Sequence, residues 1–253
     1  MGGISLEQLP GEARIAWTRL RDTLRAIAGD DVVAIWAYGS TIGADRPLRP
    51  TDLDTHVVLK RRPDADTVRR IKADEAILGE GQEWDTWFIT LADARRPDHP
   101  PHAFRPDRLD EAWALHRAHW LGGRVVLVHG PEPVELVPPP TWSELVRDLQ
   151  NELEHLERHV EAGDTDPHEA AYAVLNGSRI LRSLESHDVV LSKREGGRWA
   201  LEHLPDRWHP AIGAALNAYD GHATADEARL LAREMAPFVA MVRERWSGPP
   251  GIS

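Results

Sequence analysis

The sequence predicts an α+β protein in two parts, a small mixed β-sheet flanked by helices and then an all-helical bundle. Three observations indicate this division. Short β-branched and aromatic runs alternate with helical patterns in the first half of the chain. The run Pro138-Pro139-Pro140 then interrupts every pattern, and the residues beyond it carry only helical periodicity. We therefore expect domains at residues 1–137 and 138–253.

Within the first part, the spacing of apolar residues predicts the elements in turn. Helical spacing predicts helices at residues 6–28, 64–79 and 110–120. Runs of β-branched and aromatic residues predict strands at residues 31–38, 52–60, 84–92 and 122–130. The stretch 93–110 is rich in Pro, Asp, His and Arg, and we expect it to be a loop.

The second part reads as five consecutive helices. Apolar residues recur there at helical spacing, and no strand-like run is long enough to compete. The predicted helices cover residues 142–162, 168–186, 193–204, 209–219 and 224–246.

Composition excludes several classes of protein. The chain has no cysteine, which rules out disulfides, thiolate catalysis and cysteine-ligated zinc. No apolar run approaches the ~18 residues of a membrane span. The net charge is −11 and no basic stripe is present, so we expect no nucleic-acid partner. We expect a cytoplasmic monomer.

Histidine spacing raises the question of a zinc site. His99 and His102 are three residues apart, as are His116 and His119. No acid accompanies either pair at ligand spacing, so the pattern favours surface or packing roles.

The most informative motif joins two predicted strands. Gly39-Ser40 ends one strand, and Thr51-Asp52-Leu53-Asp54 opens the next. Asp52 and Asp54 alternate along a strand, so their carboxylates point from one face. Two such charges call for a cation, and Mg²⁺ takes oxygen ligands while keeping substrate phosphates in its shell. The amides and hydroxyl of Gly39-Ser40 are suited to phosphate oxygens. The combination indicates metal-dependent phosphoryl or nucleotidyl transfer.

This string resembles the signature of the polymerase-β-like nucleotidyltransferases. The resemblance implies that Asp52 and Asp54 bind Mg²⁺ and that Gly39 and Ser40 contact the nucleotide. Thr51 stands where many members have Ser, and it keeps the hydroxyl.

The resemblance also requires a third carboxylate on a neighbouring strand. Asp85 shares a strand face with Trp87 and Ile89, where an acid is costly to bury unless it is paired or metal-bound. Glu83 lies on the same face and is the alternative, but Asp85 lies further inside the apolar run. Asp85 is expected to act as general base or to complete a second metal site, and the sequence leaves both roles open.

The second half carries a more specific pattern. The segment 172–184 is followed by Ser192-Lys193-Arg194-Glu195, then by Trp199-Ala200-Leu201 and Ala218-Tyr219-Asp220-Gly221. In this order the segments resemble the aminoglycoside O-adenylyltransferases of the streptomycin/spectinomycin type. The resemblance covers residues 30–220 approximately.

The family resemblance implies roles for three residues of the second half. Arg179 and Lys193 match positions that reach the ATP phosphates, which suits a bidentate and a point-charge cation. Arg182, one turn later, is the alternative to Arg179. Tyr219 matches a position near the nucleotide.

Acceptor-binding residues have weaker matches. Trp113 and Glu169 are the candidates for an aromatic and an acidic contact, with Asp164 and Asp166 as neighbouring alternatives to Glu169. The guanidinium groups of streptomycin need carboxylates and an aromatic face. Since these matches are loose, the compact aminocyclitol spectinomycin is the favoured acceptor.

The resemblance implies Mg²⁺-dependent transfer of AMP from ATP to a hydroxyl of spectinomycin or streptomycin, which gives antibiotic resistance. An acidic protein suits a small cationic acceptor. One alternative is nucleotidylation of a protein or a biosynthetic small molecule by the same metal site. Another is a non-catalytic module on a decayed nucleotidyltransferase fold, but the presence of all three carboxylates argues against it.

Overall fold

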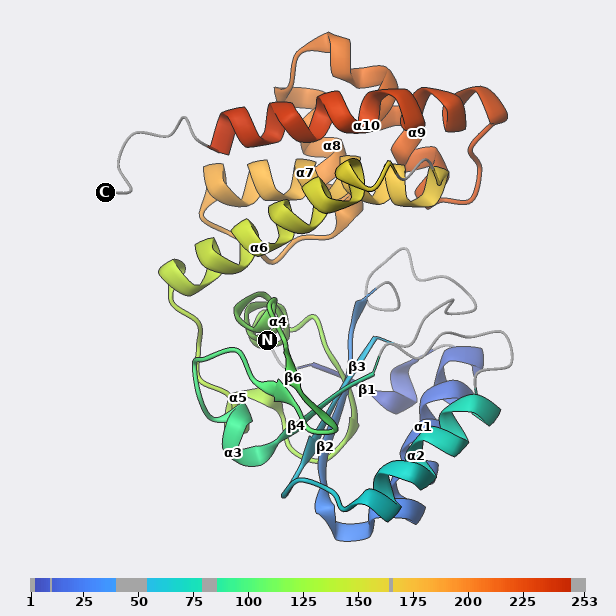
Figure 1. Cartoon of the computed structure of the whole chain (residues 1–253), viewed down its shortest axis with the longest axis vertical. Coiled ribbons are helices and arrows are strands. Elements are labelled where there is room, and N and C mark those ends of the chain that lie inside the picture. Colours follow the sequence, from blue (N-terminus) through green and yellow to red (C-terminus); the bar gives the residue numbers. More distant parts are fainter. Residues whose placement is uncertain (1–2, 10, 40–53, 79–85, 164–165, 247–253) are drawn as a thin grey trace. The chain divides into compact units, whose positions relative to one another are not determined.

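The computed structural model describes residues 3–9, 11–39, 54–78, 86–163 and 166–246. The chain divides into two compact units, Met1–Thr141 and Trp142–Ser253, which we call unit 1 and unit 2. The division falls one residue after the run of three prolines. Figure 1 shows the elements of both units.

Unit 1 contains the mixed sheet that the sequence predicts. Its strands lie in the order β1 (Ile4–Ser5), β7 (Val126–His129), β2 (Val32–Ala37), β3 (Thr55–Leu59) and β4 (Thr86–Thr90). Strand β2 runs antiparallel to both β3 and β7, whereas β3 and β4 run parallel, as do β1 and β7.

Helices cover both faces of this sheet. Helices α1 (Gly11–Ala28) and α2 (Ala65–Leu78) contact each other, and α1 buries Trp17 and Leu20 against Ile35 and Val57. Helix α4 (Trp113–Leu121) packs on the other face through Trp113 and Trp120. Successive strand residues point to opposite faces, so β2, β3, β4 and β7 each contribute to the hydrophobic cores on both sides of the sheet.

Two details differ from the sequence-based expectation. The first helix begins at Gly11, and the residues before it form β1 and a 3₁₀ turn, Leu6–Gln8, in which Ser5 N donates to Gln8 Oε1 at 2.7 Å. The predicted loop at 93–110 contains a short helix and a hairpin instead. These are α3 (Leu91–Ala94), β5 (Pro101–His102) and β6 (Arg105–Leu109). Every residue of β6 is exposed, so its sequence has no apolar alternation that would reveal it. A further short helix, α5 (Pro133–Leu136), follows β7.

Unit 2 is helical, as the sequence predicts. Its helices are α6 (Trp142–Glu161), α7 (Pro167–Ser186), α8 (Lys193–His203), α9 (His209–Tyr219) and α10 (Ala225–Trp246). Helix α7 contacts the other four and buries more than half of its residues. Its N-terminus is capped by Asp166, whose carboxylate accepts from His168 N at 2.7 Å, and Pro167 occupies the first turn.

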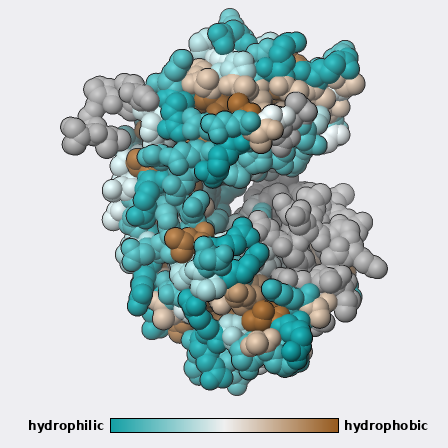
Figure 2. Space-filling model, in the orientation of Figure 1, coloured by the Kyte–Doolittle hydropathy of each residue, from teal (hydrophilic) through white to brown (hydrophobic). Residues whose placement is uncertain are grey.

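Hydrophilic side chains dominate the surface visible in Figure 2. None of the described helices combines the length and apolar character that crossing a membrane requires.

Candidate functional site

Strand β2 ends where strand β3 begins, and the two residues at this point, Ala37 and Thr55, are neighbours in the sheet. One step further, Tyr38 N donates to Asp54 O at 3.0 Å. Gly39 has a φ of +77°, and a Cβ built on it would lie 1.6 Å from Asp54 Oδ2. Only glycine fits this position, because the Asp54 carboxylate occupies the space of a side chain. The structure thus brings together the ends of the two motifs that the sequence singles out.

Five other candidates of this site lie outside the described residues. They are Ser40, Thr51, Asp52, Glu83 and Asp85. Strand β4 begins at Thr86, which pairs with Thr55 of β3. Thr86 directly follows Asp85 in the sequence, and its partner Thr55 directly follows Asp54.

A polar cluster is buried on the α4 side of the sheet. His56 Nε2 and His116 Nδ1 each lie 3.0 Å from Asp110 Oδ2. His56 is fully buried, Asp110 is buried, and the His116 side chain is 24% exposed. Rings of Tyr38 and Trp120 pack around both imidazoles. The cluster therefore brings Tyr38, which precedes Gly39, against His56, which lies two residues after Asp54.

Burial sets the protonation of His56, whereas hydrogen bonds and the charge of His116 set that of Asp110. Burial lowers the pKa of His56 to about 4, although the hydrogen bond to Asp110 opposes the shift. Burial alone would raise the pKa of Asp110. The charge of His116 and the hydrogen bonds from both imidazoles outweigh it and hold that pKa far below its usual range. His56 is thus neutral and Asp110 ionised at neutral pH.

Sequence reasoning missed His56 and Asp110. The signal for His56 was its position two residues after Asp54, because residues two apart in an extended segment point to the same side. Asp110 gave no signal beyond an acid preceding a predicted helix. A contact between residues this far apart depends on the tertiary fold.

Trp113 does not occupy a position open to an acceptor molecule. It is fully buried, and its Nε1 donates to Arg96 O at 3.1 Å. The buried guanidinium of Arg117 lies 5.6 Å from its ring centroid and donates to Pro138 O and Pro97 O. This burial contradicts the acceptor-stacking role expected from the sequence, and Trp113 is a packing residue of unit 1.

In unit 2, two predicted phosphate-binding residues lie on helices that pack together. A Cβ on Gly196 would lie 2.9 Å from Arg179 Cα, so the first turn of α8 rests on α7 at Arg179. Lys193 opens α8, and its Nζ lies 4.1 Å from the ring centroid of Tyr172. Tyr172 Oη donates to Glu152 Oε1 at 2.9 Å. Burial, with the Glu152 charge, raises the pKa of Tyr172 above its usual value, so its hydroxyl stays protonated.

The remaining predicted residues of unit 2 are partly exposed. Glu169 lies on the first turn of α7, with its Oε2 3.8 Å from His159 Nδ1. Tyr219 ends α9 with 36% of its surface exposed, and its ring centroid lies 5.9 Å from the guanidinium carbon of Arg194. Arg194 also forms an ion pair with Asp220.

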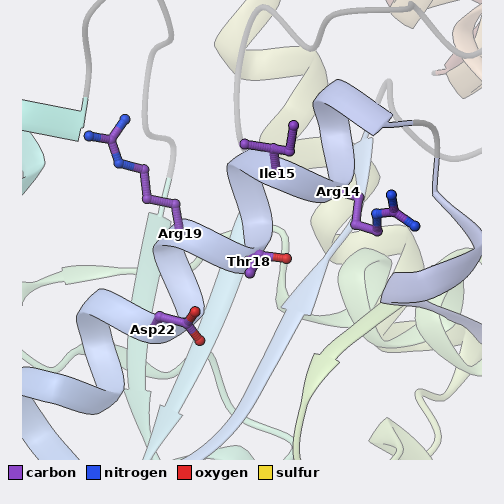
Figure 3. Close-up of a pocket in the computed structure, with 5 residues that line it drawn as sticks. All are labelled: Arg14, Ile15, Thr18, Arg19 and Asp22. Carbon is purple, nitrogen blue, oxygen red and sulfur yellow. The ribbon is translucent and has the colours of Figure 1, made fainter.

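One surface pocket lies apart from these groups. It measures about 480 Å³ and follows the outer side of α1, where Figure 3 shows its lining side chains. They are Arg14, Ile15, Thr18, Arg19 and Asp22. None of the predicted site residues that the structure describes lines it, and we assign it no function.

The chain is similar to known proteins in the sequence of its second half and in its fold. Residues 135–245 match the model of the C-terminal domain of aminoglycoside adenylyltransferases. No curated protein matches the chain in sequence. Among solved structures, the fold is similar to a spectinomycin adenyltransferase from Enterococcus faecialis, crystallised with ATP and spectinomycin. The TM-score is 0.71 at 12% identity, covering 89% of this chain and 98% of the other. Residues 135–245 are therefore similar to the C-terminal domain of aminoglycoside adenylyltransferases, and the chain shares the fold of a solved adenyltransferase.

Proposed function

We propose that this protein transfers AMP from ATP to a hydroxyl of a small cationic aminocyclitol antibiotic, releases pyrophosphate and so confers resistance. Spectinomycin is the first candidate acceptor. The family of the C-terminal domain supports the reaction class. The fold shared with an enzyme crystallised with ATP and spectinomycin supports the choice of substrates.

The observation that carries the proposal is the contact between Asp54 and Gly39. A carboxylate beside a positive-φ glycine, where two strands leave a sheet, leaves an anionic oxygen next to exposed backbone. Bringing ATP phosphates to such a carboxylate requires a cation between them, because like charges repel. Oxygen donors of this kind suit Mg²⁺.

Asp54, together with Asp52, would hold Mg²⁺ at this site. When bound, the ion neutralises charge on the reacting phosphate. The chain itself holds the Asp54 backbone to Tyr38, and glycine at position 39 leaves room for the Asp54 carboxylate. Such preorganisation matters because a group displaced by about 1 Å costs on the order of 10² in rate.

Asp85 is proposed as the general base that takes the proton from the acceptor hydroxyl, with Glu83 as the alternative. The supporting observation is register. Thr86 and Thr55 are paired neighbours, and they directly follow Asp85 and Asp54 in the sequence. A positioned carboxylate assists mainly as the proton moves, since a hydroxyl has a pKa far above neutrality.

Arg179 and Lys193 are proposed to bind the ATP phosphates, and Tyr219 to contact the nucleotide. Arg179 is half-buried in α7 where α8 packs on it, which limits its side-chain freedom before binding. Lys193 opens α8 with its ammonium over the ring of Tyr172, and a lysine binds phosphate as a compact point charge.

Glu169 is proposed to bind an amine of the acceptor. It is half-exposed, and a carboxylate at that depth pairs with an incoming ammonium without the full cost of desolvation.

The test is pyrophosphate release from ATP by the full chain, with Mg²⁺, against a panel of aminocyclitols and aminoglycosides. We expect turnover with spectinomycin, and none for Asp54→Asn, whose missing charge removes a metal ligand. Asp31→Asn, an acid of unit 1 outside the site, is the matched control and should retain activity.

If the wild type released no pyrophosphate with any antibiotic of the panel, the acceptor assignment would be wrong. Label from ATP appearing on protein in a lysate would then favour nucleotidylation of a protein. Label on a small molecule other than an antibiotic would favour a biosynthetic acceptor. Absence of Mg²⁺-dependent ATP binding would overturn the catalytic proposal as a whole.

A further inference from the structure

Three potential metal-ligand atoms converge in unit 1 from separate segments of the chain. They are His56 Nε2 on β3, His116 Nδ1 on α4 and Asp110 Oδ2 in the turn before α4. Each imidazole nitrogen lies 3.0 Å from the carboxylate oxygen, and all three atoms lie within 4.8 Å of one another. Within the described residues, no other group of three or more His, Cys, Asp and Glu meets this condition.

The carboxylate is held in place from its other side. Ala112 N donates to Asp110 Oδ1 at 3.2 Å, which leaves Oδ2 directed at the two imidazoles. Ligating carboxylates and imidazoles in metalloproteins are commonly fixed by such outer contacts. An aromatic shell of Tyr38, Trp113 and Trp120 surrounds His56 and lowers the dielectric around the cluster.

We propose that His56, Asp110 and His116 form a binding site for one divalent transition-metal ion of the zinc type. Two ligands at about 2.0–2.1 Å from a tetrahedral ion lie about 3.3 Å apart. The two observed 3.0 Å separations need to widen by only a few tenths of an ångström, and the separation of His56 Nε2 from His116 Nδ1, which is at most 4.8 Å, has to reach the same value. Imidazole donors favour Zn²⁺, Cu²⁺ or Ni²⁺ over Mg²⁺ and Ca²⁺, which prefer oxygen-only shells.

The fourth position of such an ion would belong to solvent. His56 and Asp110 are buried, but the His116 side chain is 24% exposed and gives the ion an entry path. Three protein ligands with one open position are a common arrangement for zinc outside purely structural sites. The spacing of His116 and His119 along α4 does not matter for this site, because the ligand atom of His116 lies near those of His56 and Asp110, and His119 is not part of the group.

The location gives the ion a positioning role. It would link β3 to α4 through two imidazoles, and Tyr38 packs on both rings at centroid distances of 5.3 and 5.0 Å. Tyr38 directly precedes Gly39, and His56 lies two residues after Asp54. The ion would fix the two strand ends that carry the proposed nucleotide site, without contacting the nucleotide itself.

Zinc titration of the chelator-stripped full chain tests the proposal, with excess Mg²⁺ present to occupy carboxylate sites. Competition with a chromophoric chelator gives stoichiometry and affinity, and Co²⁺ substitution reports geometry through the visible absorption of four-coordinate nitrogen–oxygen sites. We expect one ion per chain. His116→Gln should weaken its binding by at least about 100-fold, the upper end of the loss seen when only an outer contact is removed.

Matched variants separate ligation from packing. His119→Gln, one turn along α4, should bind the ion as the wild type does, and His155→Gln should exclude the histidine pair of unit 2. Zn²⁺ should raise the unfolding temperature of the wild type and of both controls, but not of His116→Gln. If circular dichroism shows His116→Gln unfolded, Asp110→Asn takes its place in the comparison. A wild type that binds no Zn²⁺, or a folded His116→Gln or Asp110→Asn with unchanged affinity, would show that the cluster is a hydrogen-bonded core network only.

Discussion

The carboxylate of Asp54 occupies the place that a side chain on Gly39 would need. The two residues belong to different strands, and their proximity follows from the antiparallel pairing of β2 with β3 and the bond from Tyr38 N to Asp54 O. Glycine at this position is therefore a steric requirement of the carboxylate as well as of the backbone.

Substitution of this glycine gives the first prediction. Gly39→Ala would place a Cβ 1.6 Å from Asp54 Oδ2 and should displace the carboxylate, lowering kcat/KM on the order of 10². Gly29→Ala is the control, since Gly29 also has a positive φ, +55°, but its Cβ would meet nothing within 4 Å. Both variants pay backbone strain of about 1–2 kcal/mol, so only steric displacement distinguishes them. Equal activity losses in the two variants would contradict the steric argument.

The third carboxylate gives the second prediction. Asp85→Asn should leave Mg²⁺-dependent ATP binding intact and lower kcat by about 10²–10⁴, the usual contribution of a general base. Calorimetry with ATP and single-turnover rates separate the two effects. Loss of ATP binding would identify Asp85 as a metal ligand instead. Glu83→Gln serves as the matched control, and a rate loss confined to that variant would transfer the base role to Glu83.

The two arginines of α7 give the third prediction. Arg179→Met should raise KM for ATP by roughly 10–100-fold, because a charged hydrogen bond to phosphate is worth about 1.5–3 kcal/mol. Arg182→Met, one turn later on the same helix, should leave KM for ATP near its wild-type value. Initial-rate kinetics over a range of ATP concentrations decide between them, and the reverse pattern would assign phosphate binding to Arg182.

Acceptor recognition gives the fourth prediction. Glu169→Gln should raise KM for spectinomycin roughly two- to fivefold while KM for ATP stays unchanged, because it removes one partly exposed charge facing an amine. Glu185→Gln, an exposed acid near the far end of α7, is the control. We also expect kcat/KM to be higher for spectinomycin than for streptomycin. An unaltered KM in Glu169→Gln would remove this residue from the acceptor site.

Stability as a function of pH gives the fifth prediction. Arg243 on α10 donates to Glu157 on α6, Nε to Oε1 at 2.7 Å, and this hydrogen bond lowers the pKa of Glu157. A carboxyl whose pKa is lowered by folding stabilises the fold above its unfolded-state pKa, and the effect disappears as pH falls through the folded pKa. Arg243→Met should therefore cost about 1 kcal/mol at neutral pH and nothing in acid.

Denaturant unfolding across the acid range measures this difference. Arg229→Met is the control on the same helix, because both side chains of its ion pair with Asp226 are largely exposed. It should change the free energy of unfolding little at any pH. A cost in Arg243→Met that persists in acid would point to lost packing rather than lost charge.

Much of the fold is predictable because its main elements carry strong local patterns. The β-branched run of β2 and the helical spacing of Trp17, Leu20 and Leu24 in α1 determine type and position well. The three prolines after residue 137 mark the place where the units separate. Short elements are different. Strand β1 has two residues and β6 is wholly exposed, so neither has a pattern to detect.

The candidate site was predictable only where its residues are neighbours in sequence or share a strand pattern. Gly39 and Asp54 fall in that class. The burial of Trp113 did not follow from its sequence, since a tryptophan at a helix start suits a ligand surface and a core equally well. His56, Asp110 and His116 meet only because α4 packs on the sheet, a tertiary arrangement that no local spacing encodes.

The tryptophans around His56 have an optical consequence. The Trp120 ring stacks on His116 with 5.8 Å between centroids, and Trp113 and Trp120 lie 6.0 and 4.8 Å from the His56 ring. Indole emission is quenched by nearby paramagnetic ions and by a cationic imidazole in contact. Emission from Trp113 and Trp120 is therefore expected to fall when a paramagnetic ion such as Co²⁺ or Cu²⁺ binds to His56, Asp110 and His116, and no dye or label is needed to see it.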